Sequence, residues 1–247
     1  MTNKAKILDF IEKRGRATSR EITKEIGVSR QYINLVIADL AAENKVIKLG
    51  RTRWAFYATP AYLSKHPEII PTSFKKRYAN RSLEEHRVFL EIEDKLPQLK
   101  ELPENVRSIF IFAFSEMFNN AIEHSVSKVI FAEVMLRDGF LSFVVNDSGI
   151  GVFRNVMKKR NLKSEIEAIQ DLLKGKTTTM PRTHSGEGIF FTSKAGDVFM
   201  LDSFGQMLTI DNLKNDITAR HTTAIKRGTR GAFRISVDSN RHLNDIF

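Results

Sequence analysis

Three polar residues recur at four-residue intervals within an otherwise apolar segment. Glu116, Asn120 and His124 lie in SEMFNNAIEHS at positions i, i+4 and i+8, so on a helix they stack along one stripe. Asn is a poor helix former, and the adjacent pair Asn119 and Asn120 has no packing reason to stand there. The stripe is typical either of a polar binding site or of an ordinary solvated helix face.

Two glycine-containing segments favour the binding site. The run FLSFVVND predicts a buried strand that ends in Asp147, with Gly149 and Gly151 directly after it. Glycines in that place let a ligand approach the backbone closely. In SGEGIFF, Gly186 and Gly188 stand where a loop turns into a helix, whose free N–H groups and dipole would face an anion.

The ordered set E-x-x-x-N-A-x-x-H, D-x-G-x-G and G-x-G resembles the GHKL ATPase superfamily, which includes gyrase, Hsp90-type chaperones, histidine kinases and MutL. The resemblance covers roughly residues 82–238, and SEMFNNAIEHS looks closest to the anti-sigma-factor serine kinases. It implies an α+β fold, with an α/β (Bergerat) sandwich on a mixed sheet. It also implies ATP and Mg²⁺ as the ligands.

The same resemblance implies a role for each motif residue. Asn120 would ligate Mg²⁺, Glu116 would be the catalytic general base, and His124 would lie near the ribose or phosphates. Asp147 would accept a hydrogen bond from the adenine amino group. The other cofactor-binding positions are expected around the adenine and the phosphates: Gly149, Gly151, Ser185, Gly186, Gly188 and Thr229. The basic and polar residues 152–185 would form the ATP lid.

One helix and a set of short strands must position these residues. Apolar side chains of residues 104–125 cover one broad helix face, with the polar stripe opposite. Six short apolar or alternating runs predict strands: KVIFAEVML, FLSFVVND, GDVFMLDS, GQMLTIDN, TTAIKRG and GAFRISV. With helices on one side, these strands describe an α+β sandwich.

The first sixty residues form a basic segment with a pattern of its own. They hold twelve Lys or Arg against six Asp or Glu, and a compact basic domain is typical of nucleic-acid binding. Helices are predicted over residues 7–15, 19–26 and 30–43. KVIKLG and RWAFYA predict a β-hairpin with a basic tip.

Three short helices and a basic hairpin resemble the winged helix-turn-helix family over roughly residues 3–58. In this family the second helix of the turn enters the major groove, and the wing reaches the backbone or the minor groove. The resemblance implies DNA contacts at the start of the third helix and in the wing, namely by Ser29, Arg30, Gln31, Tyr32, Asn34, Arg51 and Arg53. A winged helix used for dimerisation or protein contact is the alternative.

Composition restricts the remaining classes of function. The chain has 247 residues, a formal net charge of +10 and no Cys, which excludes disulfides, a thiol nucleophile and Cys-ligated metal sites. No apolar run reaches the roughly 18 residues of a membrane span, and acidic residues interrupt the N-terminal apolar stretch. A cytoplasmic protein with no membrane partner is therefore expected. A GxxxxGK[ST] motif is missing, which excludes a P-loop site.

The sequence thus predicts a winged helix-turn-helix domain over 1–58, a Pro-rich linker over 59–80, a GHKL domain over 81–238 and a tail over 239–247. The favoured function is an ATP- and Mg²⁺-binding transcriptional regulator whose nucleotide state modulates binding of double-stranded DNA or of a protein partner. The alternatives are a serine/threonine kinase acting on a protein phosphoacceptor and a slow ATPase clamp. A homodimer is compatible with each of them.

Overall fold

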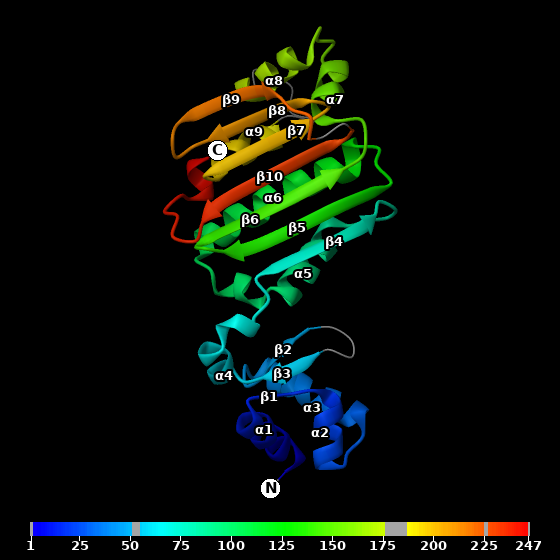
Figure 1. Cartoon of the computed structure of the whole chain (residues 1–247), viewed down its shortest axis with the longest axis vertical. Helices are drawn as coiled ribbons and strands as arrows, with labels where there is room; N and C mark the ends of the chain where they lie inside the picture. The colour runs from blue at the N-terminus through cyan, green and yellow to red at the C-terminus, as the bar shows by residue number, and fades with distance from the viewer. Residues whose placement is uncertain (1, 51–54, 176–186, 225–226, 247) are drawn as a thin grey trace. The chain divides into compact units, whose positions relative to one another are not determined.

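The computed structural model describes residues 2–50, 55–175, 187–224 and 227–246. The chain divides into two compact units, residues 1–71 and 72–247. Each unit has a hydrophobic core of its own, and Figure 1 shows the helices and strands of both.

The first unit consists of helices and a small antiparallel sheet in the order β1-β3-β2. Its elements are α1 (Asn3–Arg14), β1 (Arg16–Ala17), α2 (Ser19–Ile26), α3 (Arg30–Ala42), β2 (Ile47–Leu49), β3 (Phe56–Ala58), α4 (Pro60–Lys65) and η2 (Pro67–Ile69). Helix α3 begins at Arg30 because the Ser29 hydroxyl accepts a hydrogen bond from the Tyr32 amide, and a capping box of Thr18 and Glu21 begins α2. The second and third predicted helices agree with these bounds to within a residue, whereas the first begins earlier than predicted, at Asn3. The winged helix-turn-helix assignment stays a prediction.

The second unit is built on a seven-stranded sheet in the order β4-β5-β6-β10-β7-β8-β9. Its strands are β4 (Ser73–Ala79), β5 (Val129–Arg137), β6 (Phe140–Asp147), β7 (Val198–Ser203), β8 (Gln206–Asp211), β9 (Asp216–His221) and β10 (Thr229–Ser236). All pairings among its described residues are antiparallel, so the predicted mixed sheet is wrong. The reason is that β10 enters between β6 and β7 and runs opposite to both. These two strands are parallel to each other, but they are never neighbours.

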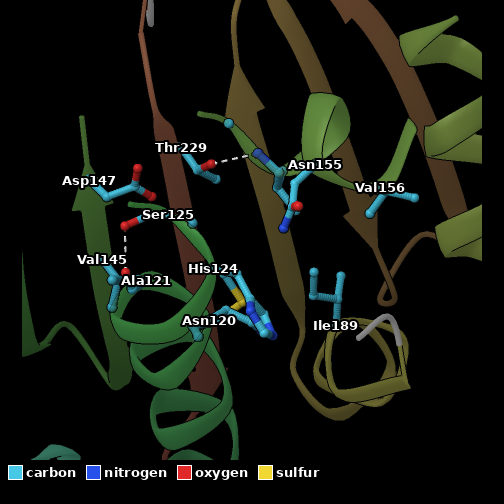
Figure 2. A pocket seen from close by; sticks show the side chains of 14 residues that line it. Asn120, Ala121, His124, Ser125, Val145, Asp147, Asn155, Val156, Ile189 and Thr229 are labelled. Carbon is cyan, nitrogen blue, oxygen red and sulfur yellow. Dashed lines mark hydrogen bonds between the residues drawn. The ribbon is translucent and has the colours of Figure 1, made fainter. Parts of the chain in front are cut away.

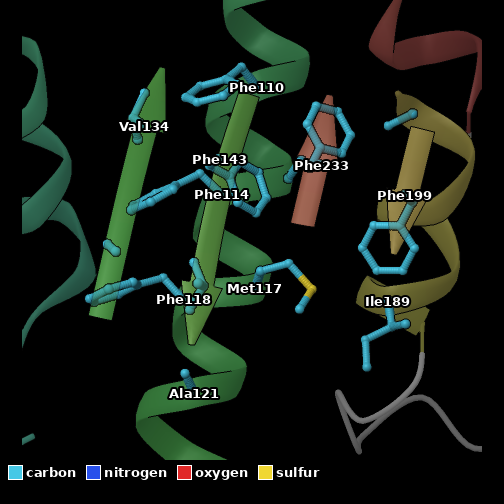
Figure 3. Close-up of a cluster of buried hydrophobic side chains, with 14 of the residues drawn as sticks. Phe110, Phe114, Met117, Phe118, Ala121, Val134, Phe143, Ile189, Phe199 and Phe233 are labelled. Atoms are coloured by element: carbon cyan, nitrogen blue, oxygen red, sulfur yellow. The ribbon is translucent and has the colours of Figure 1, made fainter. Parts of the chain in front are cut away.

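Helices cover one face of this sheet, with α6 and α9 across its middle (Figure 1). The helices are α5 (Glu85–Lys95), η3 (Pro97–Glu101), α6 (Glu104–His124), α7 (Val152–Lys159), α8 (Glu165–Lys174), α9 (Glu187–Ala195) and η4 (Leu243–Asp245). In the core, the ring of Phe143 meets Phe114 of α6 edge-on at a centroid distance of 5.5 Å and stacks on Phe233 at 5.3 Å (Figure 3). This packing fixes the rotation of α6 about its axis. No helix in the described part of the chain is long and apolar enough to span a membrane.

The segments predicted as linker and tail both contain regular structure or hydrogen bonds to the rest of the chain. Residues 59–80 contain α4, η2 and strand β4, and the hydroxyl of Tyr78 in β4 donates to Glu91 of α5 at 3.0 Å. The boundary between the units therefore falls at residues 71 and 72. The tail is attached through Asn105, whose side-chain amide donates to the carbonyl oxygens of Ser239 and Arg241.

One predicted strand is misplaced. The last strand before β10 is β9 (Asp216–His221), whereas the described residues of the predicted run TTAIKRG, namely 222–224, 227 and 228, lie in no strand. The register of the β8–β9 hairpin explains the difference. The turn after β8 brings Asp216 opposite Asp211, and the pairing continues from there until His221 lies opposite Gln206, so β9 ends at His221.

Candidate functional site

Residues singled out in the sequence meet at one pocket of the second unit, although they come from four different places in the fold. They are Asn120 and His124 of α6, Asp147 at the end of β6, Gly151 before α7 and Thr229 at the start of β10. Figure 2 shows the labelled side chains around this pocket, with residues of α7 and α9 on the side opposite α6.

Asp147 presents a buried carboxylate to this pocket. It is the last residue of β6, in which every second side chain is buried. Its Oδ1 accepts a hydrogen bond from the Gly149 amide at 2.7 Å. Burial raises the pKa of the Asp147 carboxyl above its ordinary value of 3.8, while hydrogen bonds from Gly149 and Thr229 oppose the shift. A buried acceptor of this kind suits a ligand that carries an N–H donor.

Thr229 connects two sides of the pocket. Its Oγ1 accepts a hydrogen bond from the amide of Val152, the first residue of α7, at 2.8 Å. Hydrogen bonding from Thr229 also lowers the pKa of Asp147, at the end of β6. The Thr229 side chain therefore connects β10 to α7 and stabilises the charged form of Asp147 at the pocket.

The two glycines after Asp147 are required by the packing of the chain itself. A Cβ on Gly149 would lie 1.8 Å from the carbonyl oxygen of Ser125, at the end of α6. Gly151 has φ +83°, and a Cβ there would lie 2.5 Å from Ser203 Oγ. Gly151 lines the pocket, whereas Gly149 is not among the described lining residues.

The other walls of the pocket are mostly apolar. They are formed by Met117, Ala121, Val145, Val152, Val156, Ile189 and Gly231, with polar atoms from Ser125 and Asn155. Sequence reasoning missed these residues, since most of them have apolar side chains that look like ordinary core positions. The cavity volume is about 50 Å³, well below the roughly 300 Å³ at which small-molecule sites begin. The cavity is therefore smaller than a typical small-molecule site in this structure.

Glu116 lies against α9 and is not among the described residues that line the pocket. A Cβ on Gly188 would lie 1.8 Å from Glu116 Oε2, so the carboxylate packs on the first turn of α9. The absence of a side chain at Gly188 makes room for Glu116. Of the other expected phosphate-binding positions, Ser185 and Gly186 lie outside the described residues.

The predicted lid, residues 152–185, contains two packed helices in its described part. Helices α7 and α8 bury apolar side chains, namely Phe153, Val156, Ala168, Ile169 and Leu172. An ion pair between Arg154 and Glu165 at 2.7 Å also connects them. Residues 152–174 are therefore not only basic and polar as expected, because apolar residues recur at helical spacing among the charges. Residues 176–186 lie outside the described residues.

The residues predicted to contact DNA share the exposed face of α3. Arg30, Gln31, Tyr32 and Asn34 are exposed, whereas Ile33, Val36, Ile37 and Leu40 are buried in the core of the first unit. Leu35 lies on the same outward side with 68% of its surface exposed, and sequence reasoning missed it. Arg51 and Arg53 lie outside the described residues.

A metal ion fits the pocket only in combination with a ligand that brings oxygens. In the part of the chain that the structure describes, no group of three or more His, Asp or Glu residues could hold a metal ion. Mg²⁺ commonly takes one or two protein oxygens and completes its shell with substrate phosphates and water. Asn120 offers one amide oxygen at the pocket, so the donors fit Mg²⁺ that arrives with a nucleotide.

Comparison with protein-family models found no match, and comparison with curated proteins found none either. The two resemblances therefore rest on the residues and the geometry of this chain alone.

Proposed function

We propose that residues 72–247 bind ATP with Mg²⁺ and that the nucleotide state modulates DNA binding by residues 1–71. The observation that carries the proposal is the buried Asp147 carboxylate, held by Gly149 and Thr229 at a pocket that Asn120 and His124 also line. The adenine amino group is a donor that such an acceptor can recognise. The apolar walls would cover the faces of the base.

Each polar residue of the pocket then has a task that suits its chemistry. Asp147 accepts from the base and orients it, and Asn120 offers its amide oxygen to the metal. His124 lies one turn further along α6, on the same pocket wall, and can donate to the ribose or phosphates. When bound, Mg²⁺ supplies positive charge that neutralises the phosphates.

The DNA-binding part of the proposal is supported by α3. Its exposed Arg30, Gln31 and Asn34 can hydrogen-bond to base edges in a major groove. The excess of Lys and Arg over Asp and Glu in the first sixty residues favours a polyanionic partner. If ATP changes the affinity for DNA, DNA must change the affinity for ATP by the same factor.

A second candidate function, ATP hydrolysis or phosphoryl transfer to a protein, is favoured by Glu116. Its carboxylate lies one turn before Asn120 on α6, against the first turn of α9. Binding alone needs no base, whereas turnover does. Incubation with labelled ATP, with free phosphate resolved from phosphoprotein, distinguishes hydrolysis from transfer.

Calorimetric titration of the whole chain with ATP, with and without Mg²⁺, tests the nucleotide site. We expect Asn120→Ala to remove the Mg²⁺-dependent part of the affinity. The control is Asn119→Ala, which deletes the same side chain from the same helix at a position that is not among the described lining residues. A folded wild-type protein that does not bind ATP would refute the nucleotide site. Identical DNA affinities with ATP, with ADP and with neither would refute the coupling.

A further inference from the structure

The seven-stranded sheet ends in two edge strands, β4 and β9, and β9 is the more open of them. All six residues of β9 are exposed, including Ile217 with 50% of its surface. Figure 1 shows β9 as the last strand on its side of the sheet. The outer edge of such a strand presents N–H and C=O groups that can pair with a further strand.

Opposite charges stand near the two ends of β9. Asp216 lies opposite Asp211 of β8, and in the described part of the chain no cationic side chain reaches it within ion-pair distance. Asp216 accepts a hydrogen bond from the Thr218 hydroxyl at 3.2 Å. Arg220 lies opposite Met207, whose sulfur it contacts at 3.5 Å. Neither charge forms an ion pair within the β8–β9 hairpin, although the Arg220 charge also interacts with Asp202 of β7.

Symmetry restricts how β9 can pair with a second copy of itself. A two-fold axis perpendicular to the sheet makes the strands antiparallel and keeps every side chain on its own face. Side chains alternate between the two faces of a strand, and residues directly opposite each other must share a face. In an antiparallel pair of two β9 strands, one residue therefore lies opposite its own copy, and the register is centred on that residue. Centring on Thr218 sets Asp216 opposite Arg220 of the second copy and Ile217 opposite Ala219 of the second copy. Centring on Ala219 sets Thr218 opposite Arg220 of the second copy and pairs neither charge.

We infer that β9 is a homodimerisation edge that pairs antiparallel with β9 of a second copy, in the register centred on Thr218. Two Asp216–Arg220 pairs form on the open face of the joined sheet, and two Ile217–Ala219 pairs form on the helix-covered face. Opposite charges directly across a strand pair stabilise it, whereas like charges destabilise it. The inference does not rest on the proposed nucleotide or DNA binding.

The other edge strand is built against self-pairing. In β4 a register centred on Lys76 sets Lys75 opposite Arg77 of the second copy. Lys76 itself is ion-paired with Glu91 of α5 at 2.7 Å, so the repulsion comes from Lys75 and Arg77. Cations in these positions repel a second copy and are a common protection of sheet edges. The contrast between the two edges supports pairing through β9 rather than through β4.

Charge reversal tests both the interface and its register. By sedimentation equilibrium, wild type should dimerise, and Asp216→Arg and Arg220→Asp should each raise the dissociation constant at least about tenfold, because both cross-strand pairs become repulsive. An equimolar mixture of the two variants should form heterodimers as tight as the wild-type dimer, since every pair is then again Arg opposite Asp. Arg137→Asp on β5, which is not an edge strand, should leave dimerisation unchanged.

Cross-linking supplies a second measurement. The chain has no Cys, so Thr218→Cys creates one thiol that meets its own copy across the axis, at a Cα separation of about 4.5–5.5 Å that a disulfide can span. Thr209→Cys on β8 is the control, since its copies would lie roughly 14 Å apart, three strand spacings. Oxidation should cross-link only the first variant. A wild type that stays monomeric at high concentration would overturn the inference, as would a dimer insensitive to both reversals.

Discussion

Replacing Asp147 by Asn separates ligand recognition from folding. The wild-type carboxylate accepts hydrogen bonds from Gly149, at 2.7 Å, and from Thr229. Asn has nearly the same shape, but it exchanges one of the two acceptor oxygens for an NH₂ donor. In the variant, the adenine amino group would meet either the NH₂ of Asn, which cannot accept its hydrogen bond, or the uncharged carbonyl oxygen of Asn, which accepts it more weakly.

The expected size of the effect follows from this exchange. A hydrogen bond to a charged group contributes about 1.5–3 kcal/mol, so ATP affinity should fall about 10- to 150-fold. Stability should respond differently. Because burial raises the pKa of Asp147 in the folded protein, the contribution of this group to stability is greatest below its ordinary pKa of 3.8 and is lost as the pH rises through the folded pKa. Asp147→Asn should lack this part of the pH dependence.

Calorimetry at neutral pH measures the affinity, and urea unfolding from acid to neutral pH measures the stability. The control is Asp197→Asn. Asp197 is also buried and accepts a hydrogen bond from the Ser236 amide at 2.7 Å, but it is not among the described residues that line the pocket of Asp147. It should leave ATP affinity unchanged. Equal ATP affinities of wild type and Asp147→Asn would refute the assignment of the adenine contact.

Three further outcomes are expected. In a urea titration, Gly149→Ala should lower the free energy of unfolding by about 3 kcal/mol, because its Cβ would meet the Ser125 carbonyl. The control is Gly139→Ala, where φ is +77° and the space is open; it should lower the free energy of unfolding by only about 1 kcal/mol. Arg30→Ala should weaken the preferred duplex by about 1–3 kcal/mol in fluorescence anisotropy and relax specificity, whereas equal losses for preferred and scrambled duplexes would contradict base reading. Glu116→Ala should keep ATP binding and lose any phosphate release.

The helices of the first unit were predictable because two independent local features coincide there. Thr18 and Ser29 cap helices whose apolar residues recur at helical spacing directly after them. Strand β4 was not predictable in this way. Its buried Phe74 and Tyr78 are separated by three consecutive cations, and its place beside β5 depends on residues at least 50 positions away. The same holds for the position of β10 between β6 and β7, which no local pattern encodes.

The regular geometry of α6 made Asn120 and His124 predictable as pocket residues. The same geometry explains why Glu116, which was predicted with them, does not line the pocket. An α-helix has 3.6 residues per turn, so four residues rotate the direction by about 40° beyond a full turn and advance it by about 6 Å. Glu116 and His124 therefore point about 80° apart on α6. With the rotation of α6 fixed by its Phe face against β6 and β10, Asn120 and His124 face the pocket while Glu116 faces Gly188 of α9. Any movement of α9 that widens the pocket must therefore also change the surroundings of Glu116, which physically connects the proposed binding step with the proposed base.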